Sequence, residues 1–136
     1  MAVVEELIRG ENGVLSFGNY ELPEKTKKSD FEFNGDLYKV KTFKDITKLE
    51  KNGMFVYESV PGTAVTGFKE GANVVEFTVE GTTDVSITLE LESDTEYVTY
   101  IDGINAGTVK TNLGGKLTLS VDLSGNKSSS VKIIKE

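Results

Sequence analysis

The chain of 136 residues contains no cysteine, no histidine and no tryptophan. Without cysteine it can form neither a disulfide nor a thiolate metal site, and it has no cysteine nucleophile. Without histidine it lacks the side chain that most often acts as a general base near neutral pH and most often binds zinc. We therefore predict no catalytic residue, no metal site and no cofactor.

Positive charge is also limited, because Arg9 is the only arginine and the formal net charge is −7. An acidic chain repels phosphate backbones, so nucleic acid is not expected as a partner. Glu5 and Glu6 interrupt the first apolar residues, and no later segment approaches the roughly 20 apolar residues of a membrane span. We expect no signal peptide, no membrane partner and a cytoplasmic location.

Apolar and polar residues alternate through much of the second half of the chain, which is the period of a strand with one buried face. The clearest runs are Val85–Leu91 and Leu117–Leu123, and Val75–Val79 and Val131–Ile133 repeat the pattern. The alternation predicts an all-β protein whose antiparallel strands form a β-sandwich.

Turn sequences support the antiparallel pairing. Asn-Gly occurs at residues 12–13, 34–35 and 52–53, and Asp-Gly at 102–103. Both dipeptides tolerate the positive φ values of a two-residue hairpin turn. We expect a hairpin over residues 46–58 in particular.

Two features bear on the organisation of the chain. Residues 2–9 have apolar spacing that suits either one short N-terminal helix or a strand. The Pro61-Gly62 pair is a candidate boundary between a β-rich N-terminal extension or subdomain (residues 1–61) and an Ig-like β-sandwich portion (residues 62–136). Since neither piece alone has an adequate core, we expect one cooperative unit.

Carboxylates would have to carry any chemistry in a chain without histidine. They gather at residues 30–36 and 90–96, beside turn residues, where carboxylates usually cap and solvate loops. A glycosidase needs two of them across a cleft, and no sequence spacing identifies such a pair. The same oxygens could hold Ca²⁺, although the spacing of an EF-hand loop is absent.

Tyrosines are the remaining candidates for a ligand platform, because an exposed aromatic ring can stack on a sugar. Tyr97 and Tyr100 fall on opposite faces of one strand, so at most one of them points outward. Tyr38 and Tyr57 could share an exposed face if their strands are neighbours. For any one tyrosine, including Tyr20, we expect a half-buried strand residue with its hydroxyl in water, and the ligand-binding residues stay unknown.

Two stretches carry resemblances to known proteins. The segment Thr95–Leu123, with its Asp102-Gly103 turn and its G-K-L-T-L-S-V strand, resembles the terminal Ig-like β-domain of bacterial polysaccharide-degrading enzymes. The whole chain, including S-F-G-N-Y-E-L and K-N-G-M-F-V-Y-E-S-V-P-G, resembles a family of small uncharacterised proteins from gut Clostridia. Members of that family are often labelled endosialidase.

The label implies hydrolysis of sialic acid polymers, and the residues argue against it. Sialidases of known mechanism hold the sugar carboxylate with several arginines, because a guanidinium pairs with both oxygens at once. They also use a tyrosine nucleophile assisted by a carboxylate, on a much larger scaffold. With Arg9 alone, we expect a protein that is not an enzyme.

The sequence therefore predicts a non-catalytic β-sandwich module for binding or self-assembly. Possible partners are a second copy of the chain, a carbohydrate or another protein. One alternative is an accessory protein of carbohydrate processing, with sugar binding or weak glycoside hydrolysis, and another is a phage-derived structural protein. Exposed edge strands would favour self-association, and we expect lysines to guard them, namely Lys39, Lys41, Lys132 and Lys135.

Overall fold

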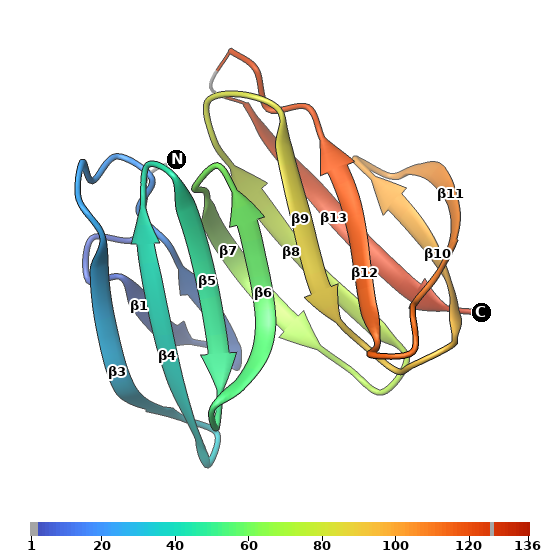
Figure 1. Cartoon of the computed structure of the whole chain (residues 1–136), viewed down its shortest axis with the longest axis horizontal. Helices are drawn as coiled ribbons and strands as arrows, with labels where there is room; N and C mark the ends of the chain where they lie inside the picture. The colour runs from blue at the N-terminus through green and yellow to red at the C-terminus, as the bar shows by residue number, and fades with distance from the viewer. Residues whose placement is uncertain (1–2, 126) are drawn as a thin grey trace.

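A computed structural model describes residues 3–125 and 127–136. Within these residues the chain is all β, with no helix, and its strands form two antiparallel sheets packed as a sandwich (Figure 1). The strands are β1 (Ile8–Glu11), β2 (Val14–Phe17), β3 (Thr26–Phe33), β4 (Asp36–Phe43), β5 (Ile46–Lys51), β6 (Met54–Val60), β7 (Ala64–Glu70), β8 (Val74–Glu80), β9 (Val85–Glu90), β10 (Glu96–Ile101), β11 (Ile104–Lys110), β12 (Lys116–Val121) and β13 (Ser128–Lys135).

Both sheets mix early and late strands. Sheet A has the order β1-β2-β7-β8-β13-β10-β11, and sheet B has the order β12-β9-β6-β5-β4-β3. Strand β2 pairs with β7, and β6 pairs with β9. Each sheet therefore contains strands from both sides of the Pro61-Gly62 pair. The predicted all-β sandwich is confirmed.

The hairpin turns have the geometry that their sequences require. The β5–β6 hairpin turns at Asn52 (φ 52°) and Gly53 (φ 80°), and the other Asn-Gly and Asp-Gly pairs have similar positive values of 52–55° and 79–83°. These values define the type I′ turn, whose twist matches that of paired strands. The hairpin expected at residues 46–58 is therefore confirmed.

The helix alternative for residues 2–9 is wrong over the residues that are described. The backbone turns at Glu5 and Glu6, Leu7 has a positive φ of 76°, and Ile8 begins β1. Ile8 and Arg9 pair with β2, and the backbone groups of Val4 and Leu7 bond to Gly18, so the local apolar spacing does not decide the structure of this segment.

The core lies between the sheets and consists of the alternating apolar residues. Val85, Ile87 and Leu89 of β9 are buried, as are Val131 and Ile133 of β13. Four aromatic rings meet at its centre, with edge contacts at 5.2–6.4 Å between centroids and one tilted pair at 5.5 Å. These rings belong to Phe17, Tyr57, Phe68 and Phe77.

A buried group of hydroxyls fixes the crossing from β6 in sheet B to β7 in sheet A. The Thr63 hydroxyl lies 2.8 Å from the hydroxyls of both Tyr57 and Ser59. Thr47 donates to the Thr63 carbonyl at 2.9 Å and accepts from its backbone N–H at 3.0 Å. Because buried polar groups are stable only when paired, this set holds the two sheets in one relative position.

Candidate functional site

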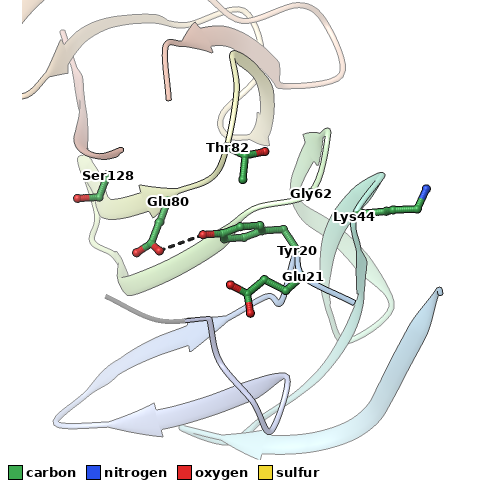
Figure 2. Close-up of a pocket in the computed structure, with 7 residues that line it drawn as sticks. All are labelled: Tyr20, Glu21, Lys44, Gly62, Glu80, Thr82 and Ser128. Carbon is green, nitrogen blue, oxygen red and sulfur yellow. Dashed lines mark hydrogen bonds between the residues drawn. The ribbon is translucent and has the colours of Figure 1, made fainter. Parts of the chain in front are cut away.

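A polar cleft of about 630 Å³ lies where the β2–β3 and β8–β9 connections meet (Figure 2). Tyr20 points across it and donates a hydrogen bond to Glu80 Oε2 at 3.0 Å. Glu21 and Thr82 line the same cleft, whereas the Lys44 side chain extends away from Tyr20 and Glu80 (Figure 2). Lys44 instead pairs with Asp45 at 3.2 Å.

The chemistry of this cleft favours a structural latch. Burial, and then the hydrogen bond to Glu80, raise the pKa of Tyr20 to about 12. The phenol is therefore a neutral hydrogen-bond donor at neutral pH and not an activated nucleophile. Arg9 does not line the cleft, and its guanidinium pairs with Glu6 and Glu11 instead. The latch ties the β2–β3 connection to the end of β8.

The two acidic clusters lie at strand ends beside turns, as expected. Asp36, in the first cluster, accepts a hydrogen bond from Asn52 at 2.9 Å between neighbouring hairpin turns. In the second cluster, Glu92 pairs with Lys135 at 3.0 Å and Asp94 with Lys110 at 3.2 Å. Across the described residues, no three Asp or Glu side chains gather as a metal site would require.

The tyrosines divide into buried and outward-facing ones. Tyr97 is buried and Tyr100 is half-buried on the outer face of sheet A, which confirms the predicted alternation. The prediction that Tyr38 and Tyr57 share an exposed face is wrong, because these side chains are only 6% and 0% exposed. Both belong to the inner face of sheet B, where β5 separates their strands.

The outer face of sheet A is hollowed into an open groove of about 710 Å³ that crosses β7, β8, β13 and β10. Strand pairing aligns its side chains in rows. One row carries hydroxyls, from Thr66, Thr78 and Ser130. The next row carries Glu76, Lys132 and Tyr100. A third row is apolar, with Val74, Ile134 and Val98.

The side chains in the first two rows are not engaged with the rest of the chain. Within the part that the structure describes, none of them takes part in a side-chain hydrogen bond or an ion pair. Glu76 and Lys132 are cross-strand neighbours, yet they form no ion pair. The groove thus presents donors, acceptors and an aromatic ring directly to solvent.

On the outer face of sheet B, some of the polar groups bind one another. Lys116 pairs with Glu90 at 3.1 Å and covers the Phe55 ring, with its Nζ 4.6 Å from the centroid. Thr88 and Thr118 share a hydrogen bond at 3.1 Å. Other cross-strand neighbours on this face, Lys39 with Glu50 and Lys48 with Glu58, form no ion pair within the residues described, as Glu76 and Lys132 do not on sheet A.

A further unusual surface is the end of the sandwich formed by β11 and β12, the neighbouring edge strands of sheets A and B (Figure 1). Register with Ile101 places Ile104 on the inner face of sheet A, yet Ile104 is 71% exposed. Leu113, in the connection between the two strands, is 86% exposed. We call this surface, with Ile101, Ile104, Val109, Leu113 and Leu119, the open end.

The opposite end is better protected. The edge strand β1 is only four residues long. The edge strand β3 carries Lys27, Lys28 and Glu32 and is interrupted by a bulge around Asp30, whose φ is 58°. Short length, charge and bulges all discourage pairing with another chain. At the open end, β11 also has a bulge, but its single charge, Lys110, is paired with Asp94.

The prediction that four lysines guard the edge strands is wrong. Lys39 and Lys41 lie on β4, and Lys132 and Lys135 lie on β13, and both strands are internal to their sheets. The alternation places residues on faces but does not give the order of the strands.

Comparison with known proteins supplies no relative: no protein-family model, no curated protein and no solved structure matches the chain. Nor does any helix among the described residues have the length and hydrophobicity needed to cross a bilayer.

Proposed function

We propose that this protein is a non-catalytic β-sandwich module that assembles with a second copy of itself through the open end. The observation that carries the proposal is the contrast between the two ends of the sandwich. One end has a short edge strand and an edge with several charges, whereas the other exposes Ile104 and Leu113 beside two free edges.

The open end provides both kinds of contact that a β interface uses. Strand β11 is at the edge of sheet A, so one side of its backbone can pair with another strand. Its two faces are also largely uncovered, since every residue from Ile104 to Thr108 is exposed. Burying Ile104 and Leu113 against a partner would remove large apolar side chains from water.

A second copy suits this edge by symmetry and by charge. A two-fold axis brings the same patch of two subunits together, and two β11 strands related by such an axis pair antiparallel. Lys110 is the one charged residue of β11, stands at its end and is paired with Asp94. Two β11 strands can therefore meet without opposing unpaired charges along their length.

Several observations support a role without catalysis. Asp36, Glu92 and Asp94 of the two acidic clusters bind side chains near turns, and Tyr20 is held as a neutral donor. The chain contains neither histidine nor cysteine. A cytoplasmic location, and the absence of nucleic acid and membranes among its partners, belong to the same proposal and rest on the net charge of −7 and the lack of long apolar segments.

The test is the oligomeric state of Ile104→Lys, measured by size-exclusion chromatography with light scattering. A charge on the inner face of an edge strand opposes strand addition, so the dimer of the wild-type protein should become a monomer. Met54→Lys is the matched control, because Met54 is also exposed (63%) but lies at the β5–β6 hairpin. It should leave the dimer unchanged. The same oligomeric state for Ile104→Lys and Met54→Lys would contradict the proposal.

A further inference from the structure

Three lysines stand directly opposite one another on neighbouring strands of sheet B. Lys27 of β3 pairs in register with Lys41 of β4, and Lys41 pairs with Lys48 of β5. Their side chains belong to the outer face, because the residues that alternate with them on β4 and β5 are buried. Among the strand pairings of the described residues, no other directly opposed pair carries charges of the same sign. We call these three residues, with Lys39 on β4, the lysine patch.

The lysine patch costs stability while no anion is bound. Like charges directly opposite each other on a sheet face repel, and Lys41 has a lysine on both sides. Lys41 and Lys48 are half-buried, which reduces the screening of their charges by water. Within the residues described, Lys27, Lys39 and Lys41 form no ion pair, and Lys48 pairs with Glu50 at 3.6 Å. The patch therefore keeps a local excess of positive charge in a chain whose net charge is −7.

We propose that the lysine patch binds a compact oligophosphate, that is, a short anion whose several negative charges lie close together. An ammonium group is a compact point charge that suits phosphoryl oxygens. One anion in contact with Lys27, Lys41 and Lys48 replaces their mutual repulsion by attraction to a common ligand. The hollow between the lysines has a volume of only about 60 Å³, far below that of a site that encloses an organic ligand. The anion therefore lies on the sheet face and is held by charge.

Acidic neighbours limit the length of the anion. Neighbouring strands are about 4.8 Å apart, so the patch spans roughly 10 Å across β3, β4 and β5. Beyond Lys48 the same row continues with Glu58 on β6, and Glu50 lies opposite Lys39. A longer polyanion, such as a nucleic acid, would reach these glutamates and the rest of an acidic surface. A compact anion stays within about one screening length of the lysines, which is roughly 8 Å at physiological salt.

The residues that line the hollow are the four lysines and Glu50, none of them aromatic. A nucleobase therefore gains no stacking platform there. We expect the phosphate groups to carry the affinity, whether they are free or belong to a nucleotide.

The experiment is an amide NMR titration of the isotope-labelled wild-type protein with sodium tripolyphosphate, and separately with adenosine triphosphate, in about 20 mM salt. We expect shifts confined to β3, β4 and β5 and a dissociation constant below about 1 mM. Raising the salt to about 300 mM should weaken binding about tenfold, because salt screens exposed charges. Since β3 and the open end are at opposite edges of sheet B, the result does not depend on self-assembly.

The two compounds distinguish the source of the phosphate. Similar dissociation constants identify a free oligophosphate as the ligand, whereas tighter binding of the nucleotide at the same strands identifies the phosphates of a nucleotide. A duplex oligonucleotide that binds these strands more tightly than either compound would overturn the proposal of a compact anion.

Lys41→Gln separates a site in the lysine patch from general attraction between an anion and surface lysines. The change should weaken tripolyphosphate binding about fivefold. Without the anion, it should raise the midpoint of thermal unfolding at low salt, because it removes both like-charged contacts. Lys69→Gln is the matched control, since Lys69 is also an exposed strand lysine but has Glu76 as its cross-strand neighbour. It makes the same change in net charge and should neither weaken binding nor raise the midpoint.

Three results would overturn the proposal. The first is an absence of shifts at tripolyphosphate concentrations up to about 10 mM, and the second is a set of shifts centred on another surface. The third is equal behaviour of Lys41→Gln and Lys69→Gln, either in affinity or in thermal stability.

Discussion

Thr63 is the residue on which the junction of the two sheets depends most. It is completely buried, and its hydroxyl and backbone bind Tyr57, Ser59 and Thr47. A buried hydroxyl that loses its partner keeps the full cost of leaving water. The buried hydrogen bonds of the Thr63 hydroxyl therefore contribute more to stability than hydrogen bonds of similar length on the surface.

Thr63→Val tests this directly. The change preserves shape but leaves the hydroxyls of Tyr57 and Ser59 without their common partner, so the free energy of unfolding in urea should fall by about 1–3 kcal/mol. Thr118→Val is the control, because the Thr118–Thr88 hydrogen bond of 3.1 Å is exposed, and it should change stability by less than about 0.5 kcal/mol. Equal losses in the two variants would show that the buried set has no special role.

Tyr20 gives the protein a defined response to alkaline pH. Its pKa is raised from 10.0 to about 12 in the folded protein, by burial first and then by Glu80. The folded state therefore holds this proton more tightly than the unfolded state does. The resulting stabilisation is complete below pH 10 and is lost as the pH rises from 10 towards 12.

Comparison with Tyr20→Phe isolates that effect. The difference in unfolding free energy between the wild type and Tyr20→Phe should be constant from pH 7 to about 9 and should shrink above pH 10. Tyr100→Phe serves as the control, because no hydrogen bond of its hydroxyl occurs among the described residues. A difference that stays constant through pH 12 would contradict the latch.

The connection between β6 and β7 is the element that tolerates change least. A methyl group on Gly62 would meet the carbonyl oxygen of Phe43 at the end of β4, and the Gly62 N–H donates to the carbonyl of Lys44 in the following turn at 3.0 Å. Backbone atoms cannot move aside as a flexible side chain can. The close approach of these two turns thus requires glycine at this position.

Gly62→Ala should lower the unfolding free energy by about 3 kcal/mol, the upper end of the cost of overpacking. Gly114→Ala is the matched control, since its added methyl would meet only the Asn112 side chain at 3.4 Å. It should be neutral or stabilise by up to about 1 kcal/mol, because alanine restricts the unfolded chain. Thermal unfolding of both variants decides the matter, and a tolerated Gly62→Ala would show that the turns can separate.

At the scale of single elements, much of the fold could be predicted from the sequence. The period of two in β8, β9, β12 and β13 identified both the strands and their buried faces, and the Asn-Gly and Asp-Gly pairs identified the hairpins. These are local properties, set by neighbours within a few residues. The pairing of β1 with β2 was harder to predict, because four residues with helical spacing gave no clear period.

The candidate surfaces depend on the order of the strands in each sheet. The alternation of apolar and polar residues does not predict that order. The alternation shows that Tyr100 faces outward, but only the neighbour relation of β10, β13 and β8 places it beside Lys132 and Glu76. For the same reason the expected guard lysines were assigned to the wrong strands. The Ig-like arrangement that the resemblance implies for residues 62–136 stays a prediction.

Seen as a whole, the described residues share one buried apolar cluster, against which part of the open end packs. The buried apolar cluster includes Phe17 and Leu49 from the first part of the chain and Leu117 and Ile133 from the last. The groove lies on the outer face of sheet A, and the open end lies at the β11 and β12 edges. The open end exposes apolar side chains next to free strand edges, which is the arrangement that association with another subunit would bury.

The most direct test is sedimentation velocity of the wild-type protein over about a hundredfold range of concentration, beside Ile104→Lys. Self-assembly through the open end predicts a dimer that dissociates on dilution for the wild type and a monomer throughout for Ile104→Lys. A wild-type protein that sediments as a monomer at every concentration would contradict it. So would a dimer that the lysine at this position leaves intact.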